Sequence, residues 1–111
     1  TLAECCFDSG GVGAKVEVAR AHDLPNLEVS LAATLFGESA SRVIVSASVA
    51  NTDGVLARAR NEGVPAAVIG RTGGDRLTMT VDDATVIDLA LGELEPVWAS
   101  GLSRYFEGRA A

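Results

Sequence analysis

Apolar residues recur at helical spacing near both ends of this 111-residue chain. Residues 2–7 are typical of the last turns of a helix. The glycine-rich segment 10–13 that follows can end it, because glycine readily takes a positive φ beyond a helix. Residues 93–106 predict a second, amphipathic helix. Its apolar face is formed by Leu94, Val97, Trp98, Leu102 and Phe106.

Between these helices the pattern predicts a sheet. Residues 14–18 alternate apolar and charged side chains, as a half-exposed strand does. Further strands are predicted at residues 42–49, 66–70, 77–81 and 85–89. Turns are predicted at residues 19–27, which include Pro25, at residues 73–75 and at residues 82–83.

Two more helices are predicted at residues 30–36 and 53–62. Asn51 or Thr52 can cap the longer one, and Gly63 and then Pro65 end it. That helix and the strands on either side of it predict a β-α-β unit, right-handed if its strands are parallel. The predicted fold class is an α/β (α+β) sandwich, with a mixed, largely antiparallel sheet and helices on one face.

The length of 111 residues predicts one domain, and the pattern of elements predicts that this domain, spanning residues 1–111, is of the α/β class. The chain opens in the middle of a helix pattern, which is typical of a fragment of a larger multidomain enzyme, truncated at its N-terminus. The net charge of −6 disfavours nucleic acid and anionic membranes as partners. No apolar run approaches the roughly 20 residues that span a bilayer. Cys5 and Cys6 are adjacent and rarely pair in that arrangement, so we expect a reduced, cytoplasmic setting.

The residues offer no catalytic centre. His22, the only histidine, falls in a predicted polar turn and has no nucleophile near it in the sequence. We expect Cys5 and Cys6 to be buried core thiols, and two thiols with one distant histidine cannot form a four-ligand zinc site. Asp75 and the pair Asp82-Asp83 suit solvated turns better than magnesium. We therefore predict no catalytic residue and no metal ligand in this chain.

The segment from Gly37 to Arg42 is the candidate binding site. A glycine lets backbone N–H groups approach a phosphate, hydroxyls donate hydrogen bonds, and arginine offers a charged fork. The expected lining of a phosphate or nucleotide site is Gly37, Glu38, Ser39, Ser41 and Arg42. The structural alternative is that Ser39 caps a turn and Glu38 pairs with Arg42.

The same loop resembles the C-terminal, aminoimidazole-ribonucleotide-synthetase-like domain of the phosphoribosylformylglycinamidine synthase family. Other blocks agree in order along nearly the whole chain, namely residues 2–6, 35–42, 64–70, 73–77 and 91–98. Two departures stand out. Ala40 lies where the family commonly has glutamine, and the family's His-Asp-x-Ser-Asp-Gly-Gly segment does not precede the first helix.

The resemblance implies an ATP-dependent carbon–nitrogen ligase of purine biosynthesis that uses ATP and Mg²⁺ when full-length. Formylglycinamide ribonucleotide would be converted to its amidine with ammonia derived from glutamine. The implied partners are the N-terminal halves of the same enzyme, a glutaminase subunit or domain, and a phosphorylated small-molecule substrate. The family's catalytic and metal-binding residues lie in those N-terminal halves, so this fragment alone is expected to be inactive.

Two alternatives remain open from the sequence. Related ATP-dependent enzymes share the fold: selenophosphate synthetase, thiamine-monophosphate kinase and the hydrogenase maturation protein. The predicted β-α-β unit and the lack of catalytic residues also suit a free-standing small-ligand-binding or regulatory module.

Overall fold

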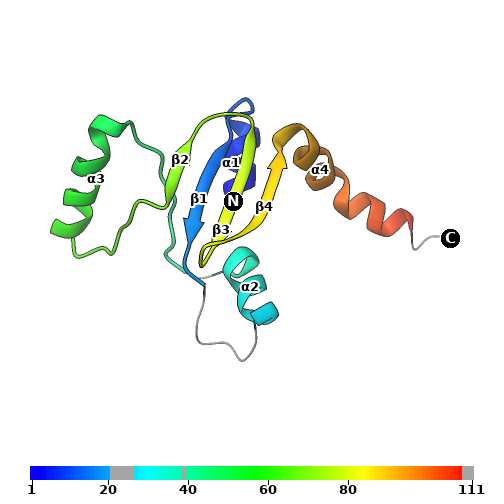
Figure 1. Cartoon of the computed structure of the whole chain (residues 1–111), viewed down its shortest axis with the longest axis horizontal. Coiled ribbons are helices and arrows are strands. Elements are labelled where there is room, and N and C mark those ends of the chain that lie inside the picture. Colours follow the sequence, from blue (N-terminus) through cyan, green and yellow to red (C-terminus); the bar gives the residue numbers. More distant parts are fainter. Residues whose placement is uncertain (21–26, 39, 109–111) are drawn as a thin grey trace.

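The computed structural model describes residues 1–20, 27–38 and 40–108 of the chain. Its centre is a four-stranded sheet with the order β2-β1-β3-β4 (Figure 1). Strand β1 (Ala14–Val18) pairs antiparallel with β2 (Gly70–Thr72) and parallel with β3 (Arg76–Val81). Strand β4 (Ala84–Ala90) pairs antiparallel with β3. The prediction of a mixed, largely antiparallel sheet is confirmed.

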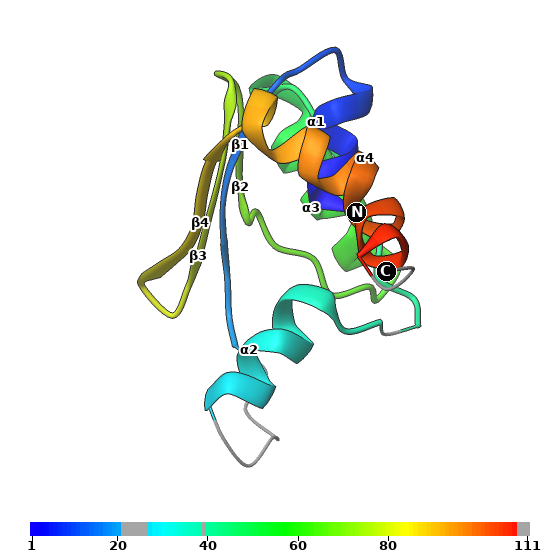
Figure 2. The same ribbon diagram turned by 90° about the vertical axis from the view of Figure 1, so that its right-hand side faces the viewer.

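Three helices lie on one side of this sheet (Figure 2). They are α1 (Leu2–Asp8), α3 (Val49–Asn61) and α4 (Leu91–Glu107). Helix α2 (Leu27–Phe36) lies at the end of the sheet where β1 ends. All four predicted helices are present, and the prediction that helices cover one face of the sheet is confirmed. Within the described ranges, no helix combines the length and apolar character needed to cross a membrane.

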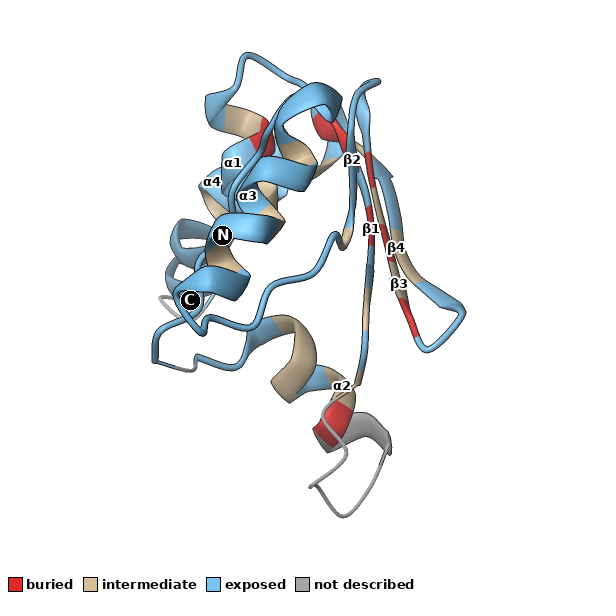
Figure 3. Cartoon of the chain, turned by 90° about the vertical axis from the view of Figure 1, so that its left-hand side faces the viewer, coloured by how far each residue is buried: buried red, intermediate tan, exposed pale blue. Residues whose placement is uncertain are grey.

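A small core lies between the sheet and helices α1 and α4. Inward residues of β1 and β3 alternate with outward ones, as the two-residue period of a strand requires. The buried residues of this core are Cys6, Ala14, Val16, Leu77, Met79 and Leu91. Figure 3 shows buried positions on β1, β3, α1 and α2, whereas α3 has none. The core therefore rests on the two central strands.

Turns join these elements largely as predicted. Gly10 and Gly11 take φ values of 82° and 88° just past α1. Asp82 and Asp83, with φ values of 46° and 65°, connect β3 to β4. Two positive φ angles in a two-residue loop suit the right-handed twist of a hairpin. The predicted turn at 19–27 falls mostly on residues 21–26, which lie outside the described residues.

The predicted strand at 42–49 is wrong. Residues 42–48 form no strand, and Val43 and Val45 are 83% and 66% exposed. β-branched residues favour a strand only when a neighbouring strand and a packed face are available. Here β2 and β4 occupy the two edges of the sheet, and the segment runs outside it.

The predicted β-α-β unit is wrong for the same reason. Its second strand begins only at Gly70 instead of residue 66, and it pairs antiparallel with β1. The Gly73 N–H donates to the Gly13 carbonyl oxygen at 2.8 Å, which fixes the pairing close to the turn. Helix α3 also begins earlier than predicted, with Ser48 at its N-cap position in place of Asn51 or Thr52.

The molecule is extended for its length. Its radius of gyration is 16.3 Å, whereas a compact domain of this size has about 13 Å. Helix α3 lies away from the sheet at one end of the molecule, and the C-terminal half of α4 projects from the other (Figure 1). Both projecting helices leave apolar side chains exposed, including Val55 on α3 and Leu102 on α4.

Candidate functional site

The candidate loop follows the last turn of α2. The Gly37 N–H donates to the Ala33 carbonyl oxygen at 2.9 Å, which ends the helix. A Cβ atom at position 37 would collide with that same oxygen, so a glycine is required there. The loop is therefore anchored at its first residue by backbone geometry.

The polar residues of the loop face outward. Glu38, Ser41 and Arg42 are exposed, and Ser39 lies outside the described residues. Ser41 has a φ of 66°, an uncommon conformation for a residue other than glycine. Within the described part of the chain, neither Glu38 nor Arg42 forms an ion pair, so the alternative that they pair with each other is not observed.

This arrangement can supply donors to an anion but does not enclose one. The sequence predicts that the loop leads into a strand. In the structure it leads into the exposed segment 42–48 instead. A shallow hollow runs along α3 and is lined by Ala50, Asn51, Gly54, Val55, Arg58, Ala59, Glu62 and Val64. The hollow contains none of the loop residues. A phosphate at Arg42 would need a second wall from elsewhere.

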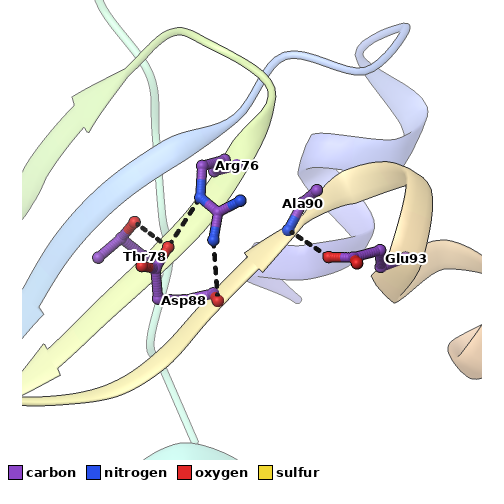
Figure 4. A network of polar contacts seen from close by, with 5 residues as sticks. All are labelled: Arg76, Thr78, Asp88, Ala90 and Glu93. Atoms are coloured by element: carbon purple, nitrogen blue, oxygen red, sulfur yellow. Dashed lines mark hydrogen bonds and ion pairs between the residues drawn. The ribbon is translucent and has the colours of Figure 1, made fainter.

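The arginine of the Gly-Gly-Asp-Arg-Leu block is held in a network on β3 and β4 (Figure 4). Arg76 Nε donates to Asp88 Oδ1 at 2.9 Å, and Arg76 Nη2 donates to the Asp88 carbonyl oxygen at 3.1 Å. Thr78, directly opposite Asp88 across the strands, donates its hydroxyl to the same carboxylate at 3.3 Å. The hydrogen bond from Arg76 lowers the pKa of Asp88 and raises that of Arg76 itself.

We assign this network a structural role. Both side chains of the Arg76–Asp88 pair are about half exposed, at 50% and 51%. The pair joins two strands, and two N–H groups of the Arg76 guanidinium donate to Asp88 of the same chain and not to a ligand. Sequence reasoning did not find it. No signal in the sequence points to it, because the contact depends on the register in which β3 and β4 pair.

Two glycines, Gly13 and Gly70, allow close backbone contacts within and beside the sheet. Gly13 N–H donates to the Gly74 carbonyl oxygen at 2.8 Å, and a Cβ at Gly13 would collide with the Arg76 backbone. A Cβ at Gly70 would collide with the Lys15 carbonyl oxygen. These close backbone approaches explain the glycines without a ligand.

Of the other predicted residues, Asp82 forms an ion pair with Arg20, with Asp82 Oδ2 and Arg20 Nε 3.1 Å apart. Cys6 is buried as predicted. The pKa of its thiol is raised mainly by this burial and to a smaller extent by the neighbouring Cys5. The prediction that Cys5 is also buried is wrong, because Cys5 lies on the outer side of the short helix α1. His22 lies outside the described residues.

Across residues 1–20, 27–38 and 40–108, no three His, Cys, Asp or Glu side chains come together in a way that could hold a metal ion. The described polar groups at the candidate loop are the guanidinium of Arg42 and the hydroxyl of Ser41, which can donate hydrogen bonds, and the carboxylate of Glu38. This set suits a phosphate better than a magnesium ion, which prefers several oxygen ligands.

Comparison with known proteins places these features in a family. A family model described as "AIR synthase related protein, C-terminal domain" matches residues 1–82. The chain is similar to proteins named "Phosphoribosylformylglycinamidine synthase subunit PurL". The one from Moorella thermoacetica is 38% identical over 102 residues, which cover 91% of this chain and 13% of that protein.

Two further relatives with the same name give similar values. The protein from Thermomicrobium roseum is 46% identical over 68 residues, covering 61% of this chain and 9% of the relative. The protein from Alkaliphilus metalliredigens is 31% identical over 106 residues, covering 96% of this chain and 13% of the relative. The chain thus spans about a tenth of the length of the relatives it matches.

Proposed function

The chain belongs to the family of AIR synthase related protein C-terminal domains, and we propose that it is such a domain of a phosphoribosylformylglycinamidine synthase. The observation that carries the proposal is the similarity to proteins of that name at 31–46% identity, over as much as 96% of this chain. In this proposal residues 1–111 form a single domain of a longer cytoplasmic ligase of purine biosynthesis.

The proposed reaction joins ammonia to formylglycinamide ribonucleotide in two steps. The terminal phosphoryl group of ATP is transferred to the amide oxygen of the substrate, which forms ADP and an activated imidate phosphate. Ammonia then attacks the amide carbon and loses a proton, and phosphate leaves with the former amide oxygen. ATP and Mg²⁺ belong to the full-length enzyme, and we assign no step of this chemistry to a residue of this chain.

The role proposed for this chain is to contribute one wall of a phosphate site. The exposed guanidinium of Arg42 and the hydroxyl of Ser41 can donate to phosphate oxygens, and Gly37 fixes where the loop begins. Ser39 and Glu38 complete the proposed lining. The N-terminal halves of the same polypeptide would supply the opposite wall, and a glutaminase subunit or domain would supply ammonia.

The free-standing regulatory module is the weaker candidate. Its main support was the β-α-β unit predicted over residues 42–70, which the fold does not contain. Related enzymes that act on other substrates remain to be separated by assay.

That assay is the turnover of the full-length protein that carries this chain. We expect ADP and the amidine to form together only when ATP, ammonia and formylglycinamide ribonucleotide are all present. ATP turnover with selenide, thiamine monophosphate or another substrate, but none with formylglycinamide ribonucleotide, would contradict the proposal.

The loop is tested by Arg42→Ala in that full-length enzyme. Losing a charged fork to a phosphate should weaken nucleotide or ribonucleotide binding by about 1–3 kcal/mol, measured by calorimetry. Arg60→Ala, which removes an exposed arginine from the last turn of α3, is the control and should leave the affinity unchanged. Equal affinities for the two variants would show that Arg42 lines no phosphate site.

A further inference from the structure

An apolar row on α4 is only partly used by the core of this domain. Leu94, Trp98, Leu102 and Phe106 follow one another at intervals of four residues and so lie along one side of the helix. Leu94 packs against the core, and the Trp98 ring lies 5.4 Å from the Phe7 ring of α1. Beyond this contact the helix projects past the sheet (Figure 1).

The outer part of the row is exposed. Trp98, Leu102 and Phe106 are 56%, 72% and 61% exposed. Large apolar side chains gathered in one place on a surface mark an interaction site more often than scattered ones do. The face of the sheet turned away from the helices is polar by comparison, because Lys15, Glu17 and Arg76 point outward there.

We propose that this row docks onto the remainder of the polypeptide to which the domain belongs. The inference rests on the proposed function in one respect, namely that a longer enzyme exists. The matched segment makes up 13% and 9% of two of the relatives, so most of such an enzyme lies outside it. The extended shape, with a radius of gyration of 16.3 Å, also fits a domain whose projecting helix is held by another body.

The exposed area argues against a second copy of this chain as the occupant. A buried aromatic side chain contributes about 150–250 Å², so the exposed parts of Trp98 and Phe106 amount to roughly 230 Å². Leu102 adds on the order of 100 Å². A symmetric pair through this row would then bury roughly 700 Å², below the ~1,200 Å² at the lower end for stable complexes. A larger body can add contacts on both sides of the helix.

The charge beside the row describes the facing surface. Glu95 is three residues before Trp98 and seven before Leu102, so it lies on the same side of the helix and is exposed. A carboxylate covered by a docked surface needs a cationic partner. The facing surface is therefore apolar, with a lysine or arginine opposite Glu95.

Cysteine labelling in the full-length protein tests the proposal. Leu102→Cys should react with a maleimide at least about tenfold more slowly than Ser103→Cys, with both sites followed by mass spectrometry. Ser103 is exposed and is the next residue, turned by about 100° around the helix axis. Phe106→Cys repeats the measurement one turn further along and should also be protected.

Equal labelling of positions 102 and 103 would overturn the proposal, because the row would then be open in the complete enzyme. Protection that disappears on dilution, as an oligomer dissociates, would assign the row to a second copy and also overturn it. Turnover of the same variants before labelling tests the enzyme assignment separately. An active enzyme with equal labelling contradicts the docking alone, whereas an inactive wild-type enzyme with a protected row contradicts the proposed function alone.

Discussion

At the scale of single residues, three glycines of this chain allow backbone segments to approach closely. Gly13, Gly37 and Gly70 each sit where a Cβ atom would meet a neighbouring backbone oxygen. Arg76 is engaged by Asp88. Arg42, the arginine of the candidate loop, is exposed.

Gly70→Ala tests the close approach of β2 to β1. The added Cβ would collide with the Lys15 carbonyl oxygen and lie 2.8 Å from the Val16 Cα, so the strands must separate. We expect the free energy of unfolding to fall by on the order of 1–3 kcal/mol in chemical denaturation. Gly54→Ala in α3 is the control, because a Cβ there meets nothing within 4 Å. It should stabilise the protein by about 0.5–1 kcal/mol, and equal effects of the two changes would contradict this explanation.

At the scale of elements, the β3–β4 hairpin and its outer polar network hold the best-paired part of the sheet. Arg76, Thr78 and Asp88 connect the two strands on the face opposite the core. The next element starts immediately, since the Ala90 N–H donates to Glu93 Oε2 at 3.4 Å in the first turn of α4. Hairpin and helix therefore form one continuous structural unit.

Acid should release the Asp88 interaction. Arg76 lowers the pKa of Asp88 in the folded protein, so its stabilising effect is complete above the unfolded pKa of about 3.9. It is lost as the pH falls from there through the lower, folded pKa. The difference in unfolding free energy between wild type and Asp88→Asn should be constant near neutrality and vanish in strong acid. A difference that stays the same at all pH values would show that the carboxylate's charge is irrelevant.

Elements with an unambiguous local signal could be predicted from the sequence. The alternation of Ala14, Val16 and Val18 with Lys15 and Glu17 gave β1 its bounds, and the spacing of Leu94 and Trp98 gave α4. Which strands pair with one another could not be predicted from local patterns. Val43 to Val45 have the composition of a strand, but strand formation depends on a neighbour that local sequence does not encode.

The candidate site shows the same difference between local signals, which the sequence contains, and contacts between elements, which it does not. The glycine, hydroxyls and arginine of the loop indicated a phosphate contact from residue type alone, and that remains a prediction. The Arg76–Asp88 and Arg20–Asp82 pairs could not be predicted, because each joins residues from elements whose register the sequence does not give. The pair of Arg20 and Asp82 is 62 residues apart in the chain.

At the scale of the whole molecule, the protein is extended, and α4 carries an exposed apolar row. The loop offers donors without an opposing wall, and α4 carries an apolar surface without a cover. Both are explained by one proposal, in which other domains of a longer synthase complete the site and cover the helix. The relatives' length is consistent with such an assembly.

The most direct test of that proposal follows the amide oxygen of the substrate. Formylglycinamide ribonucleotide labelled with heavy oxygen (¹⁸O) at its amide is turned over by the full-length protein with ATP and ammonia, and the released phosphate is weighed by mass spectrometry. Phosphorylation of the amide oxygen predicts that the label passes into inorganic phosphate, one labelled oxygen for each amidine formed. Unlabelled phosphate, or ATP hydrolysis without amidine, would contradict the assignment of this chain to a phosphoribosylformylglycinamidine synthase.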